Sequence, residues 1–188
     1  MLNIIDLTTR YSEPHRHFHN LNHISLMLTS APESLSAEQI AAIWFHDAVY
    51  RPGSPTNEED SAELARQTYD LNCSNKKLNI DIICQIILDT KTHTPSCTES
   101  ALVCDLDMAV LGSEYLDYSN YTKAIRREYS GTMSEQAFNE GRKPFLESLL
   151  LQKYIFHTAW ARGKFERWSR YNIKNELSSI CDLKRSQE

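Results

Sequence analysis

His23, the dipeptide His46-Asp47 and the acidic pair Asp105 and Asp107 follow one another along this chain. Each lies on a stretch that is predicted to be helical with one apolar face. Imidazole and carboxylate ligands together suit a divalent cation such as Mn, Fe, Co, Ni, Zn or Mg. Two histidines and two aspartates leave coordination positions open for water and substrate, which is typical of a catalytic site. The order of these residues therefore indicates a metal-dependent hydrolase.

Asp47 is predicted to lie on the apolar face of a helix. Ser36 and Gln39 have the spacing of a capping box, which marks a helix start. Counting from there at helical spacing, Ile43 and Asp47 fall on the same stripe, with His46 near its edge. An isolated carboxylate is costly to bury, and a metal ion is one of the few neighbours that offset this cost. Asp47 is therefore a strong candidate ligand.

Asp107 is the preferred ligand of the acidic pair. It lies between Val103 and Val110 on the apolar stripe of a helix predicted from Ser100 to Gly112, with the glycine as its C-terminal cap. Asp105 is two residues earlier, about 200° around the helix, so both side chains cannot reach one ion. Asp105 is expected to have a supporting or surface role.

A histidine-rich helix is predicted from Pro14 to about residue 28, because proline is favoured in a first turn. His15, His19 and His23 then share one face at four-residue spacing. A solvated first turn explains His15 and its neighbour His17 well, whereas His23 lies among apolar residues and is the candidate ligand.

The remaining segments are predicted to be helical as well. Asn57 is expected to cap a helix whose first turn, 58–60, is acidic and complements the helix dipole. Asn79 is expected to cap the most apolar and most buried helix. Further helices are predicted at 119–129, at about 144–158 and at about 162–180. The fold class is therefore all-α, with almost no strand, and residues 1–188 are expected to form one domain with helices 144–180 packed on its core.

Composition excludes several classes of function. The net charge is −5, which disfavours long polyanions, so nucleic acid is not an expected partner. No run approaches the roughly 20 apolar residues that span a bilayer, and no signal peptide is predicted. The five cysteines have no C-x-x-C spacing, which argues against a disulfide framework or a cysteine zinc site and favours a reducing cytoplasm. The oligomeric state stays open, with a homodimer as one option.

The ordered set of His23, His46-Asp47 and Asp107 resembles the His…His-Asp…Asp signature of the HD superfamily of metal-dependent phosphohydrolases. Segments spread over nearly the whole chain are similar to a small bacterial branch of predicted HD phosphohydrolases: 16–23, 42–50, 57–62, 105–112, 124–129 and 161–176. The resemblance implies an HD-like helical bundle with a central metal bound by these four residues. It does not specify a substrate. Because His93 is the one histidine between Asp47 and Asp107, one metal is favoured over two.

The mechanism implied is metal-assisted hydrolysis of a phosphate ester or anhydride of a small molecule, for which a nucleotide is one option. Lys91, His93 and Arg126 are candidates to neutralise phosphate charge, since phosphoryl transfer depends mostly on positioning and electrostatics. For Lys91 and His93, an equally good explanation is that they pair with the last carbonyls of their helix. Glu58 is a candidate to orient water or move a proton, and helix capping explains it almost as well.

Three other interpretations are open. The chain is a non-catalytic, metal-containing module that senses or binds nucleotides, because a metal site does not prove turnover. Alternatively, an iron pair serves oxygen chemistry, although this generally needs more histidines than the spacing supplies. The third alternative is a helical scaffold without metal.

His19 and Asn20 are further candidates to fix the tautomer of a ligand histidine.

Overall fold

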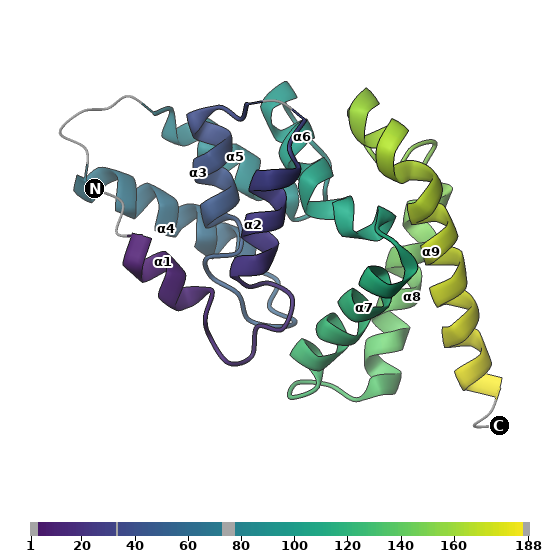
Figure 1. Ribbon diagram of the computed structural model, residues 1–188. Helices are drawn as coiled ribbons and strands as arrows, with labels where there is room; N and C mark the ends of the chain where they lie inside the picture. Colours follow the sequence, from purple (N-terminus) through teal and green to yellow (C-terminus); the bar gives the residue numbers. More distant parts are fainter. Residues whose placement is uncertain (1–3, 33, 73–77, 186–188) are drawn as a thin grey trace. The chain divides into compact units, whose positions relative to one another are not determined.

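Helices make up the regular structure of the residues described by the computed structural model, which are 4–32, 34–72 and 78–185 (Figure 1). No strand occurs within those ranges, so the all-α prediction is confirmed. The elements in chain order are α1 (Ile4–Arg10), α2 (Leu21–Ser30), α3 (Ala37–Phe45), α4 (Asn57–Asn72), α5 (Ile80–Thr90), α6 (Thr98–Asp107), the 3₁₀ helix η1 (Met108–Gly112), α7 (Tyr115–Tyr129), α8 (Glu135–Leu151) and α9 (Ala159–Arg185).

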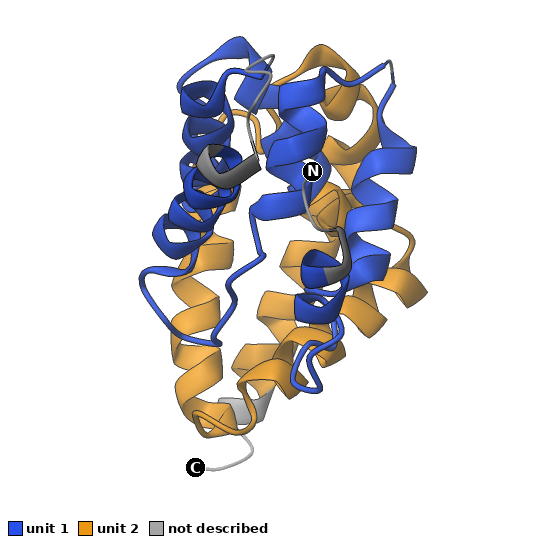
Figure 2. Cartoon of the chain, turned by 90° about the vertical axis from the view of Figure 1, so that its left-hand side faces the viewer, with its two compact units in different colours: residues 1–107 blue, residues 108–188 orange. Residues whose placement is uncertain are grey.

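Residue contacts divide the chain into two compact units, unit 1 (1–107) and unit 2 (108–188), which are coloured separately in Figure 2. Unit 1 contains α1 to α6, and unit 2 contains η1 and α7 to α9. Every residue of the predicted metal site belongs to unit 1. The predicted single domain over 1–188 stays a prediction.

Helix α5 is the centre of unit 1 and packs against α3, α4 and α6. Its start is set by Asn79, whose side chain accepts hydrogen bonds from the backbone N–H groups of Asp81 and Ile82, as predicted. Ile86 and Ile87 are fully buried, and each such side chain contributes about 1.5–3 kcal/mol to folding. This packing holds the helices that carry the candidate ligands.

Unit 2 is built around α9, which packs against α8 and η1. Its core includes Leu111, Leu146, Phe156 and Ile173, all nearly or fully buried. Gly112 ends η1 where α9 approaches closely, since a Cβ atom there would lie 2.6 Å from the Cβ of Phe165. Close packing, rather than a left-handed cap, explains this glycine.

Several predicted helix boundaries are wrong. The helix predicted from Pro14 begins instead at Leu21, because Asn20 caps it through a hydrogen bond from the N–H of Asn22. Residues 11–20 form turns, so His15, His19 and His23 do not share one helical face. Asn57 does not cap α4 from outside: it is the first residue of the helix, and its side chain bonds the backbone of Arg51.

The C-terminal helices are longer than predicted. Helix α8 starts at Glu135 with Ser134 as its cap, and Pro144 lies inside it rather than at its start. Proline lacks the N–H that a helix interior uses, but packing of Leu146 and Leu149 in the core of unit 2 holds the helix together. Tertiary packing therefore overrides the local signal. The predicted helices 119–129 and 162–180 lie within α7 and α9.

The cysteines described by the structure are Cys84, Cys97, Cys104 and Cys181, and all four are thiols. Cys73 lies outside the described residues. Among the described residues, no helix has both the length and the apolar character needed to cross a membrane.

Candidate metal centre

Three donor atoms from different helical segments of unit 1 converge. His23 lies on α2, His46 directly follows α3, and Asp107 is the last residue of α6. The Nε2 atom of His23 lies 3.3 Å from Nε2 of His46 and 3.0 Å from Oδ1 of Asp107. Nε2 of His46 lies 3.7 Å from the same Oδ1 atom. All three donor atoms are within 4.8 Å of one another, so this group could hold a metal ion.

The separations fit one ion. Metal–nitrogen bonds of about 2.0–2.1 Å place neighbouring donors roughly 2.8–3.4 Å apart in octahedral or tetrahedral coordination. The distances from His23 to the other two donors fall in this range, and the third is slightly longer. Two imidazoles and a carboxylate are ligands that suit divalent transition metals.

The tautomer of His46 also suits metal binding. Its Nδ1 lies 2.9 Å from the carbonyl oxygen of Ile43 and must donate to it, because a carbonyl oxygen can only accept. In the neutral ring, Nε2 then carries the lone pair that faces the other donors. A histidine just past a helix end reaches the carbonyl three residues earlier, so this orientation arises from the local backbone.

Asp47 is not on the helical stripe that the sequence predicted. Helix α3 ends at Phe45, and Asp47 lies in the turn that follows. It is still buried, and its Oδ2 lies 3.0 Å from Nε2 of His46. His46 is 1 % exposed rather than at the edge of the buried face. Asp47 therefore contacts one donor of the group, but it is not among the three residues whose donor atoms are all mutually close.

The two aspartates of α6 differ as the helical period predicts. Asp107 contacts His23 through Oδ1 and His93 through Oδ2, which is 3.1 Å from Nε2 of His93. Asp105 does not belong to the group of donor atoms. It is only 1 % exposed, so the expected surface role is wrong and the supporting role remains.

His93 has a backbone conformation that is unusual for its residue type. Its φ angle is 50°, the one positive value found for a non-glycine residue in the described ranges. A left-handed conformation costs roughly 1–2 kcal/mol outside glycine and persists where surrounding structure holds it. Here it accompanies the contact with Asp107, which brings an imidazole from the end of α5 to the donor group.

The charges within the group stabilise one another. Burial lowers the pKa of His46, but the neighbouring carboxylates Asp47 and Asp107 outweigh this and raise it to about 9. Burial raises the pKa of Asp47, but the imidazoles of His46 and His19 lower it by a larger amount, so the net shift is downward. Burial also opposes ionisation of Asp107, and hydrogen bonds from His23 and His93 depress its pKa overall. The carboxylates are therefore ionised and ready to bind a cation.

The first turn of α4 contains three acidic residues, of which two form ion pairs and the third, Glu58, has a raised pKa. Glu59 pairs with Lys91, and Asp60 pairs with Arg51, so both have structural partners. The Lys91 ammonium also donates to the carbonyl of Pro55. Glu58 has a pKa raised mainly by burial and further by the charge of Asp47. The negative charge beside the candidate centre therefore contributes to the raised pKa of Glu58.

Asn20 and His19 are the residues expected to fix the tautomer of a ligand histidine. Asn20 instead caps α2 and donates a hydrogen bond to the carbonyl of His17. His19 lies close to His23, with ring centroids 6.0 Å apart, and closer to Tyr50, at 4.3 Å. The partner that fixes the His46 tautomer is a backbone carbonyl. Sequence reasoning assigned no role to Arg16, because most of its hydrogen-bond partners are backbone carbonyls, which a sequence pattern does not reveal.

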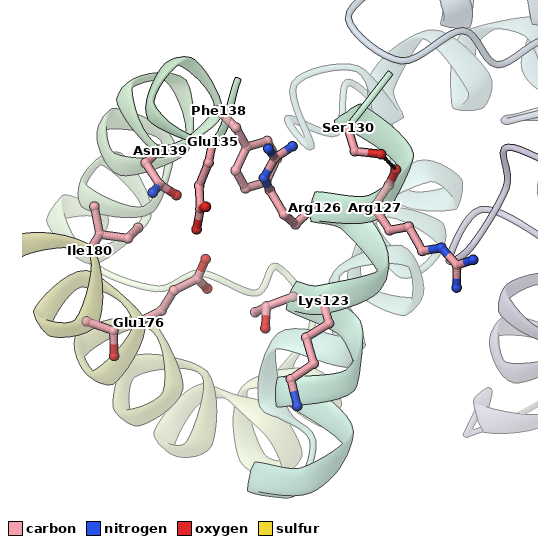
Figure 3. A pocket seen from close by; sticks show the side chains of 11 residues that line it. Lys123, Arg126, Arg127, Ser130, Glu135, Phe138, Asn139, Glu176 and Ile180 are labelled. Carbon is pink, nitrogen blue, oxygen red and sulfur yellow. Dashed lines mark hydrogen bonds between the residues drawn. The ribbon is translucent and has the colours of Figure 1, made fainter. Parts of the chain in front are cut away.

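Arg126 lies in unit 2 and lines a pocket formed by α7, α8 and α9 (Figure 3). Its guanidinium lies over the ring of Phe138, 5.3 Å from the centroid, and its Nη1 has no hydrogen-bond partner. The same pocket is lined by Lys123 and by the carboxylates of Glu135 and Glu176, so its charge is mixed. The role of Arg126 in binding phosphate stays a prediction.

No protein-family model, curated protein or solved structure matches this chain.

Proposed function

We propose that this protein is a metal-dependent phosphohydrolase of the HD type, which hydrolyses a phosphate ester or anhydride of a small molecule. The observation that carries the proposal is the convergence of His23, His46 and Asp107 in unit 1, with their donor atoms within 4.8 Å of one another. The order in which these residues occur in the sequence, together with Asp47 beside His46, supports the HD assignment.

The chain supplies the ligands and their surroundings. His23, His46 and Asp107 would hold the ion, and Asp47 would complete the set from the turn after α3. A divalent ion bound there lowers the pKa of water and polarises a phosphoryl oxygen. Few protein groups are needed beyond this, because phosphoryl transfer depends mostly on positioning and charge.

Other side chains of the candidate site have roles in this proposal. Glu58 would accept or deliver a proton, since its raised pKa allows it to carry one closer to neutral pH than an ordinary glutamate. His93 would hold Asp107 in place through their contact and present charge to a phosphate. Lys91 would contribute positive charge, shared with Glu59. Arg126 remains a candidate phosphate-binding residue within unit 2. The five cysteines without C-x-x-C spacing favour a reducing compartment, and we propose that the protein is cytoplasmic.

The test begins with metal content. Purified wild-type protein is compared by elemental analysis with Asp107→Asn and with the control Asp81→Asn, whose side chain is 79 % exposed. We expect a stoichiometric divalent metal in the wild type and in the control, and its loss in Asp107→Asn. Absence of metal in the wild type after reconstitution with Mn, Fe, Co, Ni, Zn or Mg would refute the centre.

The second step is a screen of phosphate esters and anhydrides, including nucleotides and sugar phosphates, with the ion identified in the first. Turnover that is lost in Asp107→Asn supports the hydrolase. Metal retention without turnover of any substrate would refute it and favour the non-catalytic sensor module.

A further inference from the structure

We infer that Arg16 is a positioning residue of the metal centre, because its guanidinium links the two chain segments that present the histidine ligands. One is the segment that leads into α2, which carries His23. The other is the turn after α3, which carries His46 and Asp47. This inference rests on the proposed metal centre, and it concerns how that centre is held rather than which reaction it performs.

The hydrogen bonds of Arg16 define this link. Its Nη1 donates to the carbonyl of His19 at 3.1 Å and to the carbonyl of Asp47 at 2.8 Å. Its Nη2 donates to the carbonyl of Ala48 at 3.4 Å. Its Nε donates to the carboxylate of Glu13 at 2.9 Å, which orients the guanidinium plane. One planar group therefore joins residue 19 to residues 47 and 48.

The environment of Arg16 holds it in a single position. Its side chain is 0 % exposed, and its guanidinium carbon lies over the rings of Tyr11 and Tyr50, at 5.0 Å and 5.3 Å from their centroids. Tyr11 in turn donates its hydroxyl hydrogen to the carbonyl of Trp44 in α3. A buried cation is costly unless its donors are satisfied, and here carbonyl oxygens satisfy most of them.

The turn after α3 needs such a partner. Helix α3 ends at Phe45, so the carbonyls of Asp47 and Ala48 have no helical N–H to accept from. Val49, the next residue, is held by Ser61, which bonds both its N–H and its carbonyl. Arg16 thus completes the anchoring of a short turn whose first two residues are the candidate ligands.

A lysine could not replace this arrangement. The guanidinium has donors on three nitrogens in a fixed plane, whereas an ammonium is a single point from which all donors diverge. The Arg16→Lys variant keeps the positive charge but loses the link between the two segments. Residues that orient metal ligands typically contribute about 10- to 100-fold in metal affinity. We expect a loss of this size.

The experiment is a titration of the metal-free full-length protein with Co²⁺, followed by visible absorption, for wild type, Arg16→Lys and Arg170→Lys. Arg170 is a matched control in unit 2, because it also bonds one carboxylate, Glu166, and three backbone carbonyls, but in segments that carry no ligand. Thermal unfolding of all three metal-free proteins is measured in parallel.

We expect Arg16→Lys to bind Co²⁺ about 10- to 100-fold more weakly and with an altered absorption band. Arg170→Lys should lose stability with unchanged Co²⁺ affinity and spectrum. Equal affinity and spectrum in wild type and Arg16→Lys would overturn the inference, as would an equal loss of affinity in both variants. If Arg16→Lys does not fold, Glu13→Ala is used instead, since it removes the acceptor that orients the guanidinium through Nε and should cause a smaller loss in the same direction. Unchanged affinity there would overturn the inference.

The result is distinguishable from failure of the proposed function. A wild-type protein that binds no Co²⁺ removes the metal centre and the inference with it. A protein that binds Co²⁺ and hydrolyses nothing refutes the hydrolase, while the effect of Arg16 on affinity still supports its positioning role.

Discussion

Replacement of Gly112 by alanine tests the packing of unit 2 at one atom. A Cβ atom at this position would lie 2.6 Å from Cβ of Phe165 and 2.8 Å from its Cα and carbonyl oxygen. Two of these three neighbours are backbone atoms, which cannot move away as a flexible side chain could. Gly53 is the one described glycine with a positive φ angle, so the backbone of Gly112 is in a conformation that alanine can also adopt. The substitution at Gly112 therefore introduces atomic overlap without backbone strain.

The expected magnitude comes from two opposing effects. Overpacking of a well-packed site costs about 1–3 kcal/mol. Removing a glycine stabilises the folded state by about 0.4–1 kcal/mol through the entropy of the unfolded chain. The first effect is larger because the contact is with backbone, so Gly112→Ala should destabilise the protein by about 1–2 kcal/mol net. In a chain of this length that lowers the melting temperature by roughly 2–8 °C.

Two other glycines provide controls of the opposite sign. Gly141 in α8 and Gly163 in α9 have no neighbouring atom within 4 Å of a built Cβ. Alanine is favoured over glycine in a helix by about 0.8–1 kcal/mol, so both substitutions should raise the melting temperature. Thermal unfolding followed by circular dichroism measures all three variants. A Gly112→Ala protein that is as stable as the wild type would refute the reasoning.

Three further predictions concern the metal centre, an ion pair of unit 2 and the cap of α3. Because the pKa of His46 is raised from 6.5 to about 9, its proton stabilises the metal-free fold below pH 6.5, and this contribution is lost as pH rises through 9. Zinc must displace that proton, so the affinity of the protein for zinc should rise about tenfold per pH unit from neutral pH to about 9. Competition titrations measure this affinity, and an affinity that does not change with pH would contradict the prediction. Arg142→Met should cost up to about 3–5 kcal/mol in urea unfolding, since it leaves the largely buried carboxylate of Glu176 without its cation. Glu176→Gln in the same chain should recover part of this loss. Ser36→Ala should cost about 0.5–2 kcal/mol by removing the cap of α3, while Ser178→Ala, at an exposed hydroxyl, should cost less. Equal losses at the two serines would show that the cap does not stabilise α3.

Much of the fold could be predicted from local patterns. The caps at Ser36 and Asn79 act on N–H groups within three residues, so their sequence signals are enough to place the starts of α3 and α5. The choice of Asp107 over Asp105 followed from the angle between two positions on one helix, and the structure places Asp107 in the donor group. Local signals failed at Pro14 and Pro144, because a proline restricts its own backbone but packing decides whether a helix runs through it.

The sequence by itself determined the all-α class, the caps of α3 and α5 and the residue types that could bind a metal, because these depend on neighbours a few positions away. The tertiary structure decided the rest of the site. It brings His23, His46 and Asp107 together from segments far apart in sequence, turns His93 back toward Asp107 and buries Arg16 against the turn after α3. These contacts depend on how α2, α3, α5 and α6 pack around their apolar faces, and no pattern within a single helix specifies the distance between side chains on different helices.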